Sequence, residues 1–131
     1  MSKIEADLKY TPEHEWIKKI SDTHAIIGIT DFAQGELGEL VYVEVGTVGK
    51  TLLKNQVFGT IEAVKTTSDL YLPVGGKIIE FNEALSENGG DNPGLINEDP
   101  YETGWIIKIE MTDPAEYDSL LEGDAYKALI N

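Results

Sequence analysis

Lys65 is the residue whose surroundings most suggest chemistry. It lies within GTIEAVKTTSDLYLPVGG (residues 59–76), where apolar, strand-like runs precede and follow it. The bend around it contains no glycine, so we expect the Thr, Ser and Asp side chains of residues 66–69 to hydrogen-bond to the local backbone and hold the turn. A modifying enzyme could reach a primary amine at such a tip. The residues alone leave two interpretations open, an ordinary solvated lysine and a chemical attachment point.

A second candidate, GTVGKT (residues 46–51), has the Gly-Lys-Thr ending of a phosphate-binding loop. That motif requires a glycine five residues before Gly49, where this chain has Glu44. The residues that follow, LLKNQVFG, form a poor helix, so no helix N-terminus would face a phosphate. We therefore interpret the stretch as a β-turn and not as a nucleotide site.

The sequence offers little for metal binding or nucleophilic catalysis. It contains two histidines and no cysteine, which excludes disulfides and Cys-based zinc or iron–sulfur sites. If PEHEW (12–16) is a strand, Glu13 and Glu15 share one face and His14 points to the other. The stretch DNPGLINED (91–99) lacks the spacing of a calcium loop, and no Gly-x-Ser-x-Gly motif is present. We predict no metal site and no catalytic nucleophile.

Short strand-like runs dominate the elements that must position the lysine. Thr30 is a suitable N-cap for a short helix over residues 30–39. Asp113–Pro114 begins a terminal helix that we expect Gly123 to break before DAYKALIN (124–131) forms another turn or two. The stretch SENGGDNPG (86–94) has the composition of a loop. The pattern predicts a mainly β fold, a sandwich or flattened barrel, with one inserted and one terminal helix. The strand-like runs are residues 15–20, 24–29 (a hairpin with the first), 40–45, 56–64, 69–74, 77–82 and 104–111.

Length and composition indicate one domain with an acidic surface. We predict a single domain over residues 1–131, with residues 1–7 as a tail and residues 114–131 as a C-terminal helical segment. The net charge is −14 and all ten basic residues are lysines, so we expect no nucleic-acid binding and no binding to anionic membranes. The start lacks the pattern of a signal or transit peptide, and no run is long enough to span a membrane. We therefore expect a cytoplasmic location.

The stretch around Lys65 resembles the segment around the lipoylated lysine of the glycine cleavage system H protein family. The family pattern VESVKATSDLY…PVSG corresponds here to IEAVKTTSDLYLPVGG (61–76). Several long motifs in the family's order make the resemblance specific, and it extends from about residue 8 to the C-terminal helix. The further matching blocks are YTPEHEW (10–16), IGITDFAQ (27–34), LGELVYVEV (37–45), NEAL (82–85), LINEDPY (95–101) and GWIIKIEM (104–111).

The resemblance implies a hybrid barrel-sandwich of the lipoyl/biotinyl type and a carrier that performs no chemistry itself. It implies lipoate on Lys65 as an amide, placed there by a lipoate-attaching enzyme. A pyridoxal-phosphate glycine decarboxylase would load an aminomethyl group onto the arm, a tetrahydrofolate-dependent aminomethyltransferase would unload it, and dihydrolipoyl dehydrogenase would re-oxidise the dithiol. The acidic residues of the family's cleft correspond to Glu15 and Asp69, which would hold the ammonium end of the loaded arm.

This sequence departs from the family pattern at Ala63, Thr66 and Gly75, which are small changes that remove no titratable group. The loop 86–94 is longer than usual for the family. The alternatives are a lipoyl relay for another pathway, a biotin-carrier-like protein, and an unmodified binding module. Biotinyl lysines are typically set between two methionines, whereas this lysine lies between Val64 and Thr66, which favours lipoate.

Overall fold

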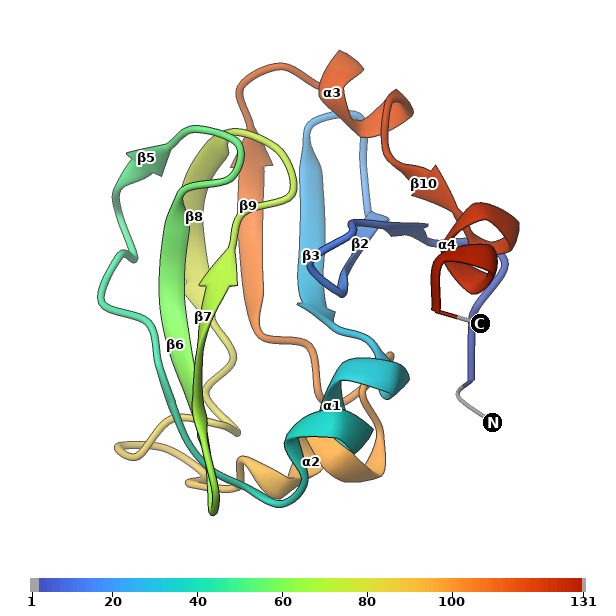
Figure 1. Cartoon of the computed structure of the whole chain (residues 1–131). Coiled ribbons are helices and arrows are strands. Elements are labelled where there is room, and N and C mark those ends of the chain that lie inside the picture. Colours follow the sequence, from blue (N-terminus) through green and yellow to red (C-terminus); the bar gives the residue numbers. More distant parts are fainter. Residues whose placement is uncertain (1–2, 131) are drawn as a thin grey trace.

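The structure, a computed structural model, describes residues 3–130. Strands dominate, and four short helices lie among or after them in this part of the chain (Figure 1). The strands are β1 (Lys9–Tyr10), β2 (Glu15–Lys19), β3 (His24–Ile29), β4 (Leu40–Glu44), β5 (Thr51–Leu52), β6 (Val57–Ala63), β7 (Thr67–Tyr71), β8 (Gly76–Phe81), β9 (Ile107–Met111) and β10 (Leu121–Glu122). The helices are α1 (Asp31–Leu37), α2 (Gly94–Glu98), α3 (Ala115–Asp118) and α4 (Gly123–Ile130).

Two antiparallel sheets make up the mainly β fold. The larger sheet has seven strands in the order β10-β1-β2-β3-β9-β8-β5, and the smaller has three in the order β4-β6-β7. Buried apolar side chains from both sheets form one core cluster. In Figure 1 the hairpin of β6 and β7 ends at the bottom of the view, at the same end of the molecule as α1 and α2.

The alternation of apolar residues explains why these runs form strands against a core. In β3, Ala25, Ile27 and Ile29 are buried and lie on one face, as a period of two requires. In β6, Phe58 and Ile61 are both buried although their spacing breaks this period. The pairing of β6 with β7 shifts register between residues 57 and 59, and such a bulge returns the next apolar side chain to the core.

A smaller aromatic cluster joins the two ends of the described chain. Tyr10 of β1 and Tyr126 of α4 stack with ring centroids 4.7 Å apart. The Trp16 indole N–H donates to the carbonyl of Pro100 at 3.0 Å, and the ring lies over Gly28. A Cβ at Gly28 would approach the indole to 2.7 Å, so only glycine fits under it. The cluster consists of Leu8, Tyr10, Trp16, Tyr101 and Tyr126.

Most of the predicted elements are confirmed. The first hairpin forms from β2 and β3, and Thr30 caps α1 because its hydroxyl accepts from the Ala33 N–H at 3.1 Å. The first terminal helix, α3, ends at Asp118, so the break predicted at Gly123 lies several residues too late, and β10 fills part of the gap. The further helical turns predicted after Gly123 are confirmed as α4. The late strand also begins later than predicted, at Ile107 rather than Gly104. Sequence reasoning missed α2, whose N-cap Pro93 offers no side-chain hydrogen bond as a signal.

Part of the predicted N-terminal tail contacts the body of the protein. The Lys3 N–H donates to the Asp31 carboxylate at 2.7 Å, and the Glu5 N–H donates to the Tyr10 hydroxyl at 2.8 Å. Residues 1, 2 and 131 lie outside the described residues. A single domain over residues 1–131 stays a prediction. Within residues 3–130, no helix has the length and apolar character needed to cross a membrane.

Candidate functional site: an exposed lysine and an adjoining cleft

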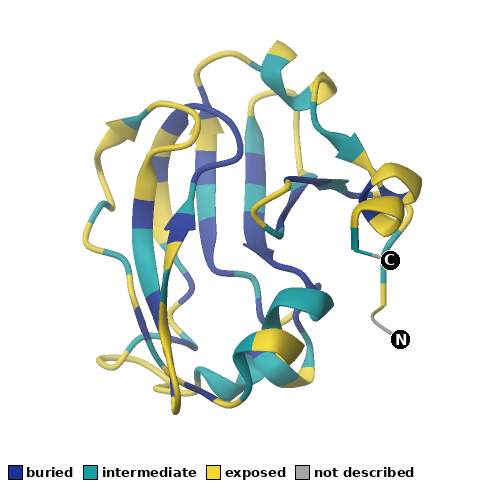
Figure 2. Cartoon of the chain, in the orientation of Figure 1, coloured by how far each residue is buried: buried dark blue, intermediate teal, exposed yellow. Residues whose placement is uncertain are grey.

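Lys65 lies at the exposed tip of the hairpin formed by β6, β7 and the residues between them, which we call the lysyl hairpin (residues 57–71). Figure 2 shows this tip as exposed along both sides of the turn. Backbone bonds hold it: the Ala63 N–H donates to the Thr66 carbonyl at 2.7 Å, and the Val64 N–H donates to the Glu39 carbonyl at 3.1 Å. The amine is therefore presented to solvent by a turn that is fixed on both sides.

The prediction that polar side chains hold this turn is wrong. Among the described residues, the side chains of Thr66, Thr67 and Asp69 make no hydrogen bond to the backbone, and the Ser68 hydroxyl makes one of 3.3 Å to the carbonyl of Asp69. Residues from Thr67 onward already belong to β7. The polar stretch after Lys65 is thus the first part of a strand whose pairing with β6 sets the geometry.

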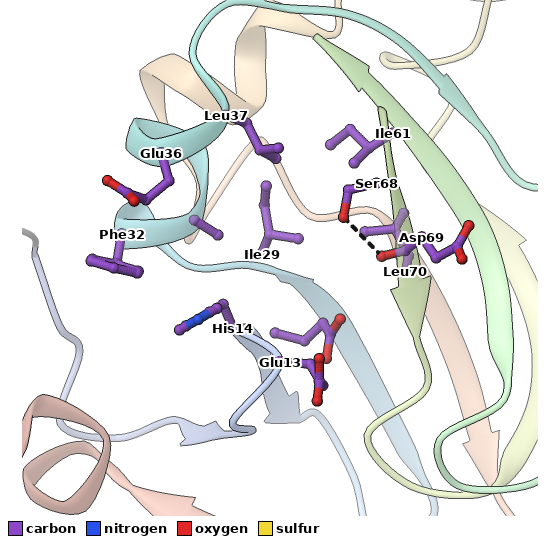
Figure 3. A pocket seen from close by; sticks show the side chains of 12 residues that line it. Glu13, His14, Ile29, Phe32, Glu36, Leu37, Ile61, Ser68, Asp69 and Leu70 are labelled. Carbon is purple, nitrogen blue, oxygen red and sulfur yellow. Dashed lines mark hydrogen bonds between the residues drawn. The ribbon is translucent and has the colours of Figure 1, made fainter. Parts of the chain in front are cut away.

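A cleft of about 250 Å³ lies beside the lysyl hairpin, between β7, α1 and the turn that precedes β2 (Figure 3). Its walls are partly apolar, with carboxylates and one imidazole added from the turn before β2, from α1 and from β7. The cleft would suit a flexible carbon chain that ends in a cation, because apolar surface and acidic groups lie in one space. The lining residues are Glu13, His14, Glu15, Ile29, Phe32, Ala33, Glu36, Leu37, Ile61, Ser68, Asp69 and Leu70.

Glu15 is a buried carboxyl that links the two sheets across this cleft. Glu15 is only 2% exposed. One carboxyl oxygen accepts a hydrogen bond from the Thr11 hydroxyl at 2.8 Å, and the other accepts one from the Tyr71 N–H of β7 at 3.2 Å. Burial raises the pKa of Glu15 to about 8, although these two donors act in the opposite direction. The carboxyl is therefore mostly protonated near neutral pH, and a cation brought beside it would favour its ionised form.

His14 is placed differently from the sequence prediction. The strand β2 begins only at Glu15, and His14 adopts a left-handed backbone with φ of 70°. Glu13, His14 and Glu15 consequently all line the cleft, and the alternation predicted for a strand is wrong here. The His14 Nδ1 lies 2.9 Å from the Tyr126 hydroxyl, which in turn lies 2.7 Å from the Thr30 hydroxyl.

Tyr126 belongs to α4, so this helix helps to hold His14 in the wall of the cleft. Partial burial lowers the pKa of His14, so the imidazole is neutral over most of the physiological range. Sequence reasoning missed Tyr126, because a tyrosine near the C-terminus gives no sign of the turn that it contacts. No group of three or more acidic or histidine side chains within residues 3–130 is arranged to hold a metal ion.

Asp69 lines the cleft from β7 but remains exposed. Figure 3 shows its carboxylate pointing away from the side chains of Glu13 and His14. The structure thus brings Glu15 and Asp69 to the same cleft, but it buries only the first. A cation in the cleft would meet Glu15 in a largely dry environment, whereas Asp69 would contact it at the solvent-exposed rim.

The fold and the presented lysine define a class of protein, the carrier domains of the lipoyl and biotinyl type. The model of the family described as "Glycine cleavage H-protein" matches residues 8–131. Relatives called "Glycine cleavage system H protein" include one from Bacteroides thetaiotaomicron, 53% identical over 125 residues with 95% of each chain covered. Another, from Symbiobacterium thermophilum, is 50% identical over 128 residues, which is 98% of this chain and 96% of the relative.

A solved structure supports the same assignment. The crystal structure of a glycine cleavage system H protein from Mycobacterium marinum superposes with a TM-score of 0.84 at 35% identity, and the match covers 95% of this chain and 97% of that one. The chain belongs to the glycine cleavage H-protein family. It is a lipoyl carrier of the glycine cleavage system and not one of that system's catalytic enzymes. The family that the sequence resembles is thereby confirmed.

Proposed function

We propose that Lys65 carries lipoate as an amide and that the cleft receives the amine-bearing end of the loaded arm. The observation that supports this most directly is that β7, which begins two residues after Lys65, runs from the lysine to the cleft. Asp69 lies four residues after Lys65, which along extended backbone is about 13 Å. A lipoyl-lysine arm has a length on the order of 10 to 15 Å from ordinary bond lengths. An arm anchored at the tip could therefore lie back along β7 and reach the cleft.

The residues present fit lipoate. Lys65 offers an exposed primary amine for amide formation, and the apolar side chains of Ile29, Phe32 and Leu37 offer a surface for a carbon chain. When attached, lipoate supplies a dithiol that carries the one-carbon amine unit between enzymes. A tether of this kind raises the effective concentration of the carried group at each active site.

Glu15 would act by exchanging a proton for a cation. With the cleft empty, burial keeps the carboxyl protonated near neutral pH, because its pKa is about 8. An ammonium group that enters the cleft stabilises the carboxylate, so Glu15 releases its proton to solvent and forms a charge-assisted hydrogen bond with the cargo. The Thr11 hydroxyl and the Tyr71 N–H already point at the two oxygens and would keep the carboxylate oriented. A loaded arm that filled the inner part of the cleft would also keep water from the labile cargo.

Asp69 would give a second, weaker contact at the rim. Its exposure means that solvent competes for any ion pair that it makes. We assign it the role of guiding the ammonium group toward Glu15 and of closing the outer side of the cleft once the arm has entered.

Membership of the glycine cleavage system implies contact with its other components. We propose that these are a pyridoxal-phosphate glycine decarboxylase, a tetrahydrofolate-dependent aminomethyltransferase and dihydrolipoyl dehydrogenase, with a lipoate-attaching enzyme as a further partner. The net charge of −14 supports encounter with positively charged partner surfaces. The cytoplasmic location stays a prediction.

The mass of the intact protein tests the assignment of Lys65. The chain should be purified from cells that lipoylate their own carrier proteins and then measured intact and after digestion. We expect an increment of one lipoyl group, on the peptide that contains Lys65. A biotinyl increment would instead support a biotin-carrier-like protein, and an unmodified mass would support a plain binding module. A lipoylated chain that does not support glycine cleavage with the purified partner enzymes would support a relay for another pathway.

A further inference from the structure

The tip of the lysyl hairpin depends on a segment of the chain that does not belong to the hairpin. Besides the bond within the turn, the Val64 N–H donates to the Glu39 carbonyl at 3.1 Å. Glu39 lies in the connection between α1 and β4, with Gly38 before it and Leu40 after it. The position of Val64, next to Lys65, therefore depends on the position of this connection.

Asn97 of α2 holds that connection on both sides of Glu39. Its Nδ2 donates to the Gly38 carbonyl at 2.9 Å, and its Oδ1 accepts from the Leu40 N–H at 3.0 Å. The same Nδ2 also donates to the Gln34 Oε1 of α1 at 2.9 Å. The Gly38 carbonyl needs a donor and the Leu40 N–H needs an acceptor, so only an amide in this orientation satisfies both.

The stem of Lys65 passes directly beside the segment that Asn97 holds. Gly38 has φ of 82°, in the left-handed region, and a Cβ built on it would lie 3.7 Å from the Lys65 Cε. A glycine at this point lets the connection turn without backbone strain, and it places no side chain against the methylene groups of Lys65. The clamped connection thus bonds to the backbone before Lys65 and lies close to the lysine side chain.

We propose that Asn97 is a positioning residue for the modification of Lys65. This proposal rests on the proposed function, since it assumes that a lipoate-attaching enzyme acts on the Lys65 amine. The amide of Asn97 fixes residues 38–40, the Glu39 carbonyl fixes Val64, and the attaching enzyme meets a lysine already held in one place. Without the clamp the enzyme would have to order the tip itself when it binds, and that ordering would weaken productive binding.

The test uses Asn97→Asp, which keeps the shape of the side chain but removes both donors and places a carboxylate oxygen against two acceptors. The unlipoylated protein would be incubated with a lipoate ligase, lipoate and ATP, and the modified fraction followed by intact mass. We expect kcat/KM for lipoylation to fall about tenfold, in proportion to the loss of hydrogen bonds at a partly buried site. Hydrogen exchange of the Val64 amide should become about tenfold faster, while the Ile27 and Ile109 amides in the core stay as in the unaltered chain.

Two variants serve as controls. Asn88→Asp makes the same change of charge on an exposed loop, and it should leave both measurements unchanged. Gln34→Ala removes one of the three partners of the Asn97 amide but leaves its bonds to Gly38 and Leu40, so it should slow lipoylation only about twofold. Should Asn97→Asp fail to fold, Gln34→Ala and Asn88→Asp carry the comparison alone.

The outcomes separate this proposal from its alternatives. An unchanged rate in folded Asn97→Asp would overturn it. A slower rate with unchanged Val64 exchange would also overturn it, because Asn97 would then act by touching the enzyme rather than by holding the tip. An equal loss in Asn88→Asp would show an effect of charge. If the unaltered chain is not lipoylated at all, the proposed function fails, and unchanged Val64 exchange in Asn97→Asp would still show separately that the clamp is wrong.

Discussion

The tip of the lysyl hairpin and the inner wall of the cleft differ in how far they expose a titratable side chain to water. Lys65 is exposed, and the turn that carries it is fixed by backbone hydrogen bonds. Glu15 is 2% exposed, is bonded through both oxygens, and has its pKa raised to about 8 by burial. One region exposes an amine to solvent, and the other shields a carboxyl group from it.

This difference separates two requirements of a carrier. A group that must meet several enzymes has to be accessible, whereas the cargo between those meetings has to be protected. In the proposed function the single strand β7 would serve both, since it begins just after Lys65, its Asp69 lines the cleft, and its Tyr71 N–H donates to Glu15. Changes at the exposed end should therefore affect modification, and changes at the buried end should affect stability and the lifetime of the cargo.

The largest effect is expected from removing the amine at the exposed end. Lys65→Arg should fold as the unaltered chain does, because Lys65 is exposed, but it should carry no lipoate, since a guanidinium does not form the amide. Intact mass and thermal unfolding would be measured side by side, with Lys77→Arg as a matched exposed lysine. A lipoyl increment on the Lys65→Arg variant would contradict the assignment of the attachment site.

A smaller but distinctive effect is expected at the buried end. The pKa of Glu15 is about 8 in the folded protein against an ordinary value of 4.5, so between these values the native state binds a proton that the unfolded chain has lost. Glu15 therefore stabilises the fold fully below pH 4.5, and this contribution falls as pH rises toward 8. The slope is about 1.4 kcal/mol per pH unit for one proton.

Urea unfolding between pH 5 and pH 8 would measure this slope. The free energy of unfolding of Glu15→Gln should fall less steeply with pH than that of the unaltered chain, because the amide does not titrate. Glu62→Gln removes an exposed carboxylate and should keep the original slope. Parallel curves for Glu15→Gln and the unaltered chain would mean that the carboxyl is not protonated in the native cleft, and would remove the proton exchange from the proposed function.

The smallest effect is expected at the rim of the cleft. Asp69→Asn should leave lipoylation intact and should shorten the lifetime of the loaded arm by no more than about fivefold, because an exposed ion pair stabilises by about 1 kcal/mol or less. The decay of the loaded protein, followed by release of the one-carbon unit, would be compared with Asp113→Asn, which changes an exposed aspartate outside the cleft. A loss larger than that of Glu15→Gln would reverse the ranking of the two carboxyl groups.

The order of the main strands and the exposed place of Lys65 at a hairpin tip could be predicted from the sequence alone. Local alternation of apolar residues determines strands such as β3, and a Thr at the N-cap determines the start of α1, because both depend on neighbours along the chain. Several long motifs in the family's order, between residues 10 and 111, were also sufficient to identify the family. These features do not depend on contacts between distant residues.

Only the tertiary structure determines which contacts fix the turn that carries Lys65 and which residues enclose Glu15. The turn is tied to the Glu39 carbonyl rather than by its own Thr and Ser side chains, and Glu15 is enclosed because β7 and the turn before β2 meet there. His14 faces the cleft because its φ is 70°, which no alternation rule predicts. Hydrogen bonds between remote segments and the burial of a charge depend on how the sheets pack, and a single sequence does not encode that in any local pattern.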